Sequence, residues 1–297
     1  MQQPSKTVEF EGIGTHWIID LYGTEPKLGY TKLTNLINQR IEVFDKTYSR
    51  FRTDSTLATL FTAAGSVNLP EDSQALFTFY EQLYGVTEGK VTPLIGDVLV
   101  NAGYDVKYSL KPHSKPKPAQ LWEDVLDFDY PSLSVTKPTV IDVGAAGKGY
   151  LVDIISELLT DNGLGTFVVD AGGDMRHVSS SPVGLRVGLE HPRNPELVIG
   201  VATINNKSIC CSADNRRTWA GMHHVMDPKS GKSTTEIIAV WVVADDCMTA
   251  DGLATALFFC DGQKLSTHYD FEYVLVKKDL SYEVSQNCTI ELFEAAL

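Results

Sequence analysis

A carboxylate and a hydroxyl lie four residues apart in the segment MTADGLAT, residues 248–255. The pattern predicts a short helix over residues 251–259, in which Asp251 and Thr255 share one face near its start. Carboxylate and hydroxyl oxygens suit Mg²⁺ or Ca²⁺ rather than zinc. The helix dipole alone also favours a carboxylate at this position. The spacing therefore leaves two interpretations open, a hard-cation site and an ordinary N-terminal carboxylate.

Two glycine-rich loops flank a predicted helix in the middle of the chain. The sequence IDVGAAGKGY from Ile141 places Asp142 on an extended segment and Lys148 in a loop of small residues, residues 144–149. An apolar stripe over residues 151–159 predicts the helix, and a strand over residues 166–169 leads into the second loop, DAGGD. Small residues, a lysine and a helix N-terminus suit a phosphate-bearing ligand, whereas tight turns between packed elements explain the same glycines. The glycine spacing excludes a P-loop and a standard Rossmann fingerprint.

A pair of neighbouring histidines, His223 and His224, precedes the turn sequence DPKSG. The pattern predicts a short strand ending in a turn, so the two imidazoles point to opposite faces and cannot bind one metal ion together. Histidine titrates near neutral pH, which makes His224 a candidate general base. A hydrogen-bonded structural histidine is the alternative interpretation.

Composition and charge limit the possible partners of the chain. Its 297 residues are 43% hydrophobic and 21% charged, which is typical of a globular protein with a sizeable core. The formal net charge of −13 argues against a nucleic-acid or anionic-membrane surface, and an acidic protein that binds a polyphosphate needs a local cation. The five cysteines include no CxxC pair, which predicts buried free thiols rather than disulfides or zinc.

The compartment follows from what the sequence lacks. No stretch is apolar and long enough to span a membrane, and the N-terminal sequence does not have the pattern of a secretory signal. We therefore expect a cytoplasmic protein, or an extracytoplasmic one if a leader has been trimmed.

Periodicity predicts the elements that must position these residues. Helical spacing predicts amphipathic helices over residues 30–44 and 72–84, and strands are predicted over residues 8–23, 183–204 and 236–244. Residues 107–117 are basic and contain prolines, which favours a solvated surface loop over a docking patch. The mixture of helices and alternating strands predicts an α+β fold with mixed, antiparallel-rich sheets and flanking helices.

Taken together, these segments resemble the FAD:protein FMN transferase (ApbE) family over roughly residues 10–260. The family pattern DLG[GA]xAKGYxxD is similar to residues 142–153, and NxGGD[IM]R is similar to residues 170–176. The pattern HHI[IL]DPx[TS]G is similar to residues 223–231, and MTADxL[AS]TA[LF] to residues 248–257. Near the N-terminus, Sx[FY]xxxS is similar to residues 49–55. These motifs occur in the order of the family.

The resemblance implies roles for individual residues. Mg²⁺ would be held by the carbonyl of Ala145, the carboxylate of Asp251 and the hydroxyl of Thr255, and His224 matches the candidate base. Thr92 stands where the family usually has aspartate. The residues implied to bind FAD are Ile13, Ser49, Phe51, Lys90, Val91, Thr92, Asp142, Lys148, Gly172, Gly173, Asp174 and Val225.

The resemblance also implies an activity and an organisation. The chain would be one ApbE-like domain, residues 1–297, with the FAD cleft between its N-terminal, central and C-terminal segments. A Mg²⁺-dependent reaction would move FMN from FAD to a threonine hydroxyl of an acceptor protein through a phosphoester, with release of AMP. Because the chain lacks the short acceptor motif of family substrates, the acceptor would be a separate redox-complex subunit or reductase. The alternatives are a Mg²⁺-dependent FAD pyrophosphatase and a non-catalytic flavin-binding protein.

Overall fold

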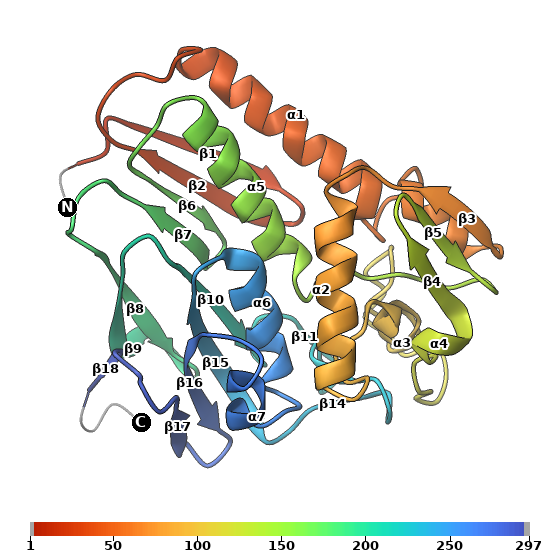
Figure 1. Cartoon of the computed structure of the whole chain (residues 1–297). Coiled ribbons are helices and arrows are strands. Elements are labelled where there is room, and N and C mark those ends of the chain that lie inside the picture. Colours follow the sequence, from red (N-terminus) through yellow and green to blue (C-terminus); the bar gives the residue numbers. More distant parts are fainter. Residues whose placement is uncertain (1–2, 294–297) are drawn as a thin grey trace.

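The structure is a computed structural model that describes residues 3–293. The predicted domain of residues 1–297 therefore includes short ends that lie outside the described residues. A large antiparallel sheet runs through the molecule in the strand order β1-β2-β6-β7-β10-β15-β16-β17 (Figure 1). Its strands are β1 (Lys6–Gly12), β2 (Thr15–Leu21), β6 (Phe167–Ala171), β7 (Asp174–Val178), β10 (Ser208–Ala213), β15 (Ile237–Ala244), β16 (Glu272–Lys277) and β17 (Tyr282–Val284).

Helices cover one face of this sheet, and smaller sheets complete the molecule. Figure 1 shows α1, α5 and α6 in front of the large sheet. The helices are α1 (Tyr30–Tyr48), α2 (Ser73–Val86), α3 (Gly96–Asn101), α4 (Trp122–Val125), α5 (Gly147–Asp161), α6 (Cys247–Ala256) and α7 (Gly262–Ser266), with the 3₁₀ turns η1 (Thr56–Phe61) and η2 (Pro93–Ile95). The smaller sheets pair β3 (Gly65–Asn68), β5 (Ser132–Val135) and β4 (Leu126–Asp129); β18 (Glu291–Leu292), β9 (Asn194–Ile204) and β8 (Leu185–His191); β11 (Thr218–Trp219) and β12 (Met222–His223); and β13 (Met226–Asp227) and β14 (Lys232–Ser233).

The central strand β15 separates two hydrophobic cores. Val240 and Val242 face the core under the helices, whereas Trp241 and Val243 face a second core that the β8–β9 hairpin covers. Successive side chains of a strand point to opposite faces, so burial of both faces explains the continuous apolar run of this segment. Each fully buried side chain of this size contributes roughly 1.5–3 kcal/mol to folding.

Helix α1 follows the apolar spacing of its sequence and is one turn longer than predicted. Leu33, Ile37, Ile41 and Phe44 are buried at intervals of three or four residues. Thr47 and Tyr48 continue the same buried face, so the helix ends at Tyr48 rather than at residue 44. Helix α2 likewise runs slightly past its predicted end and ends at Val86.

Three local predictions near the glycine-rich loop are wrong. The segment of Asp142 is not a strand, because its N–H donates to the carbonyl of Pro93 in a loop rather than to a sheet neighbour. Helix α5 begins at Gly147, inside the predicted loop of residues 144–149. Helix α6 begins at Cys247 rather than at Asp251, because side chains outside the helix satisfy its first N–H groups. Asp251 therefore lies inside the helix and not in its first turn.

The histidine segment also differs in detail. The strand β12 is only two residues long and ends at His223, and β13 begins after a break at Met226. His224 thus lies between two short strands.

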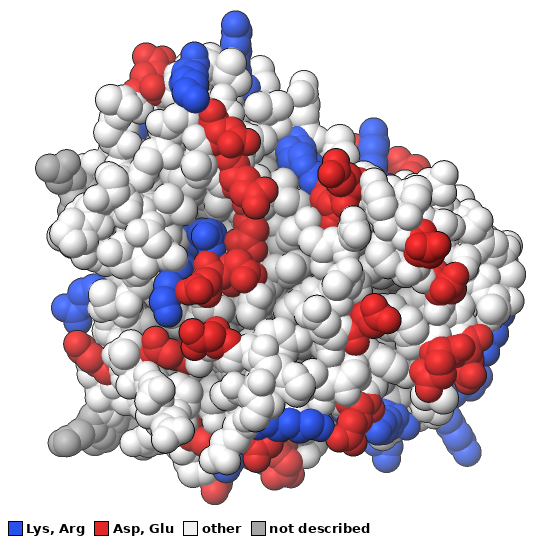
Figure 2. All heavy atoms as spheres, viewed as in Figure 1, with Lys and Arg blue, Asp and Glu red and all other residues white. Residues whose placement is uncertain are grey.

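The observed sheet and its flanking helices confirm the predicted α+β fold class. The described residues contain no helix with the length and apolar character needed to cross a bilayer. Figure 2 shows a band of acidic side chains over the helical face, in keeping with the net charge of −13.

Candidate active site

The close contact of α5 with α6 depends on a glycine. A Cβ atom at Gly149 would lie 2.2 Å from the carbonyl oxygen of Cys247 and 2.8 Å from Cβ of Asp251. The N–H of Gly149 donates to Oδ2 of Asp251 over 2.9 Å. Only a residue without a side chain permits this approach, so this glycine of the loop has a packing role.

Asp153 on α5 anchors the first turn of α6. Its carboxylate accepts the N–H of Cys247 over 2.9 Å and that of Met248 over 2.8 Å. Asp246 caps the same end by accepting the N–H of Thr249 over 2.7 Å. Burial raises the pKa of Asp153 to about 7, although these N–H donors and the charge of Arg176 act against the shift. No role was predicted for Asp153, although it is the last residue of the family motif at residues 142–153.

Asp251 offers an oxygen that suits a cation. Its side chain is 5% exposed, and Oδ1 makes no hydrogen bond to any residue that the structure describes. Burial raises the pKa of this carboxyl group, and the positive charge of Lys148 acts against that rise. A buried carboxylate is stable in its charged form only when a positive charge is nearby. The hydroxyl of Thr255 lies one helical turn after Asp251 on α6.

The predicted metal-binding set is poor in charged ligands. Within residues 3–293, no group of three or more His, Cys, Asp or Glu side chains is placed to hold a metal ion. Ala145 would contribute only its carbonyl oxygen, and its N–H donates to the hydroxyl of Tyr80 over 3.1 Å. One carboxylate with neutral oxygen donors fits Mg²⁺, which keeps several waters and binds substrate phosphates. The residues present therefore fit a magnesium ion that is bound largely by its substrate.

Two hairpin turns meet beside Lys148. Lys148 forms an ion pair with the buried carboxylate of Asp174 at the start of β7. Gly172 has a positive φ of 66°, and a Cβ atom there would lie 2.1 Å from Oγ1 of Thr15 in the β1–β2 hairpin. Ile13 lies in that hairpin turn, also with a positive φ. The structure thus brings Ile13, Gly172, Asp174 and Lys148 to one end of the sheet.

Asp142 is held by a buried arginine. Arg50 Nε donates to Oδ2 of Asp142, and Arg50 Nη1 donates to the carbonyl of Tyr104 over 2.7 Å. The guanidinium carbon lies 4.0 Å from the ring centroid of Phe51. The N–H of Gly144 also donates to Asp142, over 2.7 Å. Arg50 was missed as a site residue, although the arginines of its loop were visible in the sequence.

His224 is partly buried, and its imidazole is neutral. Burial lowers its pKa to about 4, with further lowering by the charges of Arg217 and His223 and an opposing effect of Asp142. Its Nδ1 is buried and makes no hydrogen bond within the described part of the chain. The imidazole is therefore unprotonated at pH 7 and free to accept a proton.

The charge of Arg217 influences both Asp251 and His224. The positive charge of Arg217 lowers the pKa of Asp251 as well as that of His224. Burial raises the pKa of Tyr80, and the charges of Asp142 and Asp251 raise it further. Arg217 is exposed and makes no ion pair with any described residue. No motif in the sequence singled it out.

The other predicted FAD-binding residues have partners of their own. Lys90 Nζ lies 2.8 Å from a carboxylate oxygen of Asp227, which belongs to the histidine motif of residues 223–231. The hydroxyl of Thr92 accepts the N–H of Leu94 over 3.1 Å and so caps η2. Val91 is buried in the core under the helices. The structure thus brings Lys90 into contact with the histidine motif, whereas the hydroxyl of Thr92 binds the backbone of its own turn.

Four further residues of the predicted FAD-binding set, Ser49, Phe51, Val225 and Gly173, have contacts of their own. Ser49 follows the last residue of α1, and its N–H donates to the carbonyl of Asp45. The ring of Phe51 stacks on Tyr108 with a centroid distance of 5.1 Å. Val225 is buried in the same core as Val91. The N–H of Gly173 donates to Asp170 over 2.7 Å and so closes the β6–β7 turn.

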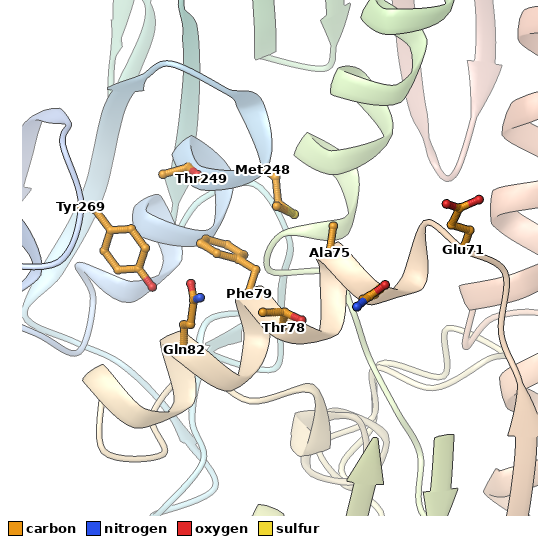
Figure 3. Close-up of a pocket in the computed structure, with 9 residues that line it drawn as sticks. Glu71, Ala75, Thr78, Phe79, Gln82, Met248, Thr249 and Tyr269 are labelled. Carbon is orange, nitrogen blue, oxygen red and sulfur yellow. The ribbon is translucent and has the colours of Figure 1, made fainter. Parts of the chain in front are cut away.

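A surface pocket of about 600 Å³ lies between α2 and the first turn of α6 (Figure 3). Residues of α2 line it together with Met248, Thr249 and Tyr269. The hydroxyl of Thr249 already donates to Asp246. None of the residues predicted to bind FAD or metal lines this pocket, so it is separate from the site around Asp251.

The sequence comparisons agree with the motifs. The model of the ApbE family matches residues 13–272. A "FAD:protein FMN transferase" of Vibrio cholerae is 26% identical over 86% of this chain and 82% of the relative. A protein of the same name from Haemophilus influenzae is 30% identical over 71% of this chain and 67% of the relative.

Solved structures share the fold. The flavin transferase ApbE from Vibrio cholerae superposes with a TM-score of 0.78 and 20% identity, over 94% of this chain and 96% of that one. The ApbE protein from Thermotoga maritima superposes with a TM-score of 0.83 and 21% identity, over 95% of this chain and 97% of that one.

Proposed function

Because this chain belongs to the ApbE family, we propose that it is a FAD:protein FMN transferase that moves FMN from FAD to a threonine hydroxyl of an acceptor protein. The product would be a phosphoester, and AMP would be released. The observation that supports the proposal is a buried carboxylate, Asp251, under the positive charges of Lys148 and Arg217, together with a neutral His224 that Arg217 also influences. We also propose that one domain carries the whole reaction.

The proposed reaction balances without an oxidant or reductant. The threonine oxygen attacks the phosphorus on the FMN side of the FAD diphosphate. A P–O bond forms, the P–O bond to AMP breaks, and AMP leaves with the bridging oxygen. His224 accepts the threonine proton, because its imidazole is unprotonated at pH 7. A base with a pKa of about 4 is weak, and the negative charge of a bound diphosphate raises that pKa toward the useful range.

The remaining residues bind and orient the substrate. Lys148 and Arg217 supply positive charge near Asp251, which suits the diphosphate. Arg50 holds the carboxylate of Asp142 in a fixed position for FAD. Ala145, Asp251 and Thr255 would hold Mg²⁺, which supplies charge neutralisation of the transferring phosphoryl group when bound.

The test is the intact mass of candidate acceptor domains after incubation with the protein, FAD and Mg²⁺, with an EDTA control. We expect a metal-dependent mass gain of one FMN with an equal amount of AMP. FMN and AMP in solution without a modified acceptor would instead support FAD pyrophosphatase activity. Intact FAD with every acceptor would contradict both reactions and leave a flavin-binding protein.

A further inference from the structure

A second pocket, of about 390 Å³, lies next to the histidine pair. His223 lines it, whereas His224 belongs to the site described above. His223 is the last residue of β12, and His224 follows it in the break before β13, so the pocket and the proposed base are neighbours along the chain. The other residues that matter here are Arg193, Lys232, Thr234 and Lys278.

The lining of this pocket carries buried polar atoms without partners. His223 is 9% exposed, and its Nε2 lies 2.8 Å from the carbonyl oxygen of Thr234, which assigns the proton to Nε2. Its Nδ1 is then an acceptor that receives no hydrogen bond from the described residues. The hydroxyl of Thr234 is also buried and unpartnered among these residues. Such atoms cost free energy unless a ligand or water satisfies them, and a peptide backbone offers both donors and acceptors.

The rim of the pocket is positively charged, in contrast to the rest of the molecule. Lys232 and Lys278 are exposed and form no ion pair within residues 3–293, whereas Arg193 is paired with Asp214 over 2.7 Å. Pro116, which also lines the pocket, belongs to the basic segment of residues 107–117. Residues 106–122 include four lysines and no acidic residue, although the whole chain has a net charge of −13.

Backbone contacts hold this basic segment against the histidine motif. The N–H of Ala119 donates to the carbonyl of Pro228 over 2.7 Å. Gly231 has a positive φ, and a Cβ atom there would lie 2.5 Å from the carbonyl oxygen of Lys117. The backbone at Lys117 and Ala119 therefore has a fixed place beside the histidine motif, although residues 107–117 are exposed except for Ser109, as expected for a surface loop.

We propose that this pocket and its lysine rim dock an acidic, extended segment of the acceptor protein next to the threonine that is modified. The proposal rests on the proposed function. The buried polar atoms bind the backbone of the segment, and the lysines bind its carboxylates. Because His223 and His224 are consecutive residues, a segment that docks here binds next to the part of the chain that carries the proposed base.

The binding test uses a fluorescein-labelled peptide of glutamates with one central threonine, measured by anisotropy at about 0.15 M salt, where exposed charges beyond about 8 Å are screened. The double variant Lys232→Glu/Lys278→Glu should bind at least tenfold more weakly than the wild type. The double variant Lys6→Glu/Lys32→Glu is a matched control, because both lysines are exposed, lack ion pairs among the described residues and change the net charge equally. It should bind within twofold of the wild type.

Three outcomes would overturn the docking surface: no binding by the wild type, equal weakening by both double variants, or displacement of the peptide by AMP. Thr234→Val removes the buried hydroxyl at nearly constant volume, and it should weaken peptide binding without lowering the melting temperature.

A kinetic arm separates this proposal from the proposed function. With an acceptor domain that becomes flavinylated, Lys232→Glu/Lys278→Glu should raise KM for the acceptor more than it lowers kcat. If no acceptor is modified but the peptide results hold, the docking surface stands and the proposed transfer fails. A lower kcat with unchanged KM would contradict docking.

Discussion

At the scale of single residues, the candidate site contains a buried carboxylate with one oxygen free of hydrogen bonds to the described residues, and a neutral imidazole. Asp251 keeps one oxygen free of hydrogen bonds to the described residues, while the carboxylate of Asp142 is engaged by Arg50. His224 is held neutral by burial and by nearby positive charge. We therefore propose different roles for the two carboxylates, cation binding for Asp251 and orientation of FAD for Asp142.

Asp251→Asn tests the cation site with little change of shape. The amide oxygen can still accept the N–H of Gly149, so the fold should persist. Loss of the negative charge should lower metal-dependent transfer at least 100-fold, which is about 2.7 kcal/mol of activation free energy. Rates by intact mass at several Mg²⁺ concentrations measure this. Wild-type activity with an unchanged Mg²⁺ dependence would refute the assignment.

His224 predicts a specific pH dependence of stability. Its folded pKa of about 4 lies below the ordinary value of 6.5, so the unfolded chain binds more protons between these values. Stability is thus present above pH 6.5 and is lost as the pH falls through 4, by roughly 3 kcal/mol in total. Urea unfolding of the wild type and His224→Gln at pH 7 and pH 4.5 checks this. The wild type should lose more stability than the variant on acidification, and parallel losses would contradict the buried neutral state.

At the scale of elements, the contact of α5 with α6 positions the site. The two helices lie about a hundred residues apart in sequence, and they meet where Gly149 leaves room for the backbone of α6. Asp153 then fixes the first turn of α6 from α5. The helix that carries Asp251 and Thr255 is thus placed by α5 rather than by its own sequence.

Gly149→Ala should disturb this contact. The new methyl group would overlap the carbonyl of Cys247, and overpacking of this kind costs typically 1–3 kcal/mol. Transfer activity should fall as well, because Asp251 moves with α6. Gly85→Ala in α2 is the matched control, since a Cβ atom there meets no other atom within 4 Å. Replacing a helical glycine by alanine stabilises by about 0.5–1 kcal/mol, so the two melting temperatures should move in opposite directions.

Asp153 predicts a second pH effect, of opposite sign to that of His224. Its folded pKa of about 7 lies above the ordinary value of 3.8, so its contribution is full below pH 3.8 and is lost as the pH rises through 7. The loss is of the order of 4 kcal/mol. Asp153→Asn cannot ionise, so the stability of the wild type minus that of the variant should decrease between pH 4 and pH 8. A constant difference, measured by urea unfolding, would show that Asp153 titrates normally.

At the scale of the whole molecule, two cores enclose the large sheet and bury part of the thiols. Cys210 on β10 and Cys247 on α6 are both buried under the helices, with their sulfur atoms 3.4 Å apart. All five cysteines are free, but only Cys210 and Cys247 are buried, whereas the sequence predicted burial for most of them. Burial raises the pKa of both Cys210 and Cys247, which suppresses the reactive thiolate.

Thiol reactivity therefore reports the integrity of the larger core. With a thiol-specific reagent at pH 8, Cys210 and Cys247 should stay unmodified in the folded protein and react only on unfolding. Cys260 and Cys288 are only partly buried and are the candidates for reaction in the native state, whereas burial raises the pKa of Cys211 to about 12 and suppresses its thiolate. Peptide mass mapping identifies the modified residues. Rapid native labelling of Cys210 would mean that the contact between β10 and α6 opens readily.

The sequence by itself determined the residue types of the site and most of the regular elements. The apolar spacing of α1 and the double-sided apolar run of β15 are local patterns, so helix and strand followed from them. The ordered motifs were enough to indicate the family, because each is a contiguous segment. The assigned roles of individual residues stay predictions.

Only the tertiary structure decided which residues meet. The start of α6 depends on Asp153, and the position of Asp142 depends on Arg50, a residue 92 positions away in the chain. The low pKa of His224 depends on its burial and on the charge of Arg217, which the fold brings close to it. Such effects arise from long-range packing and the local dielectric environment, to which sequence periodicity is blind. For the same reason, only the folded chain places the basic segment of residues 107–117 beside the histidine motif.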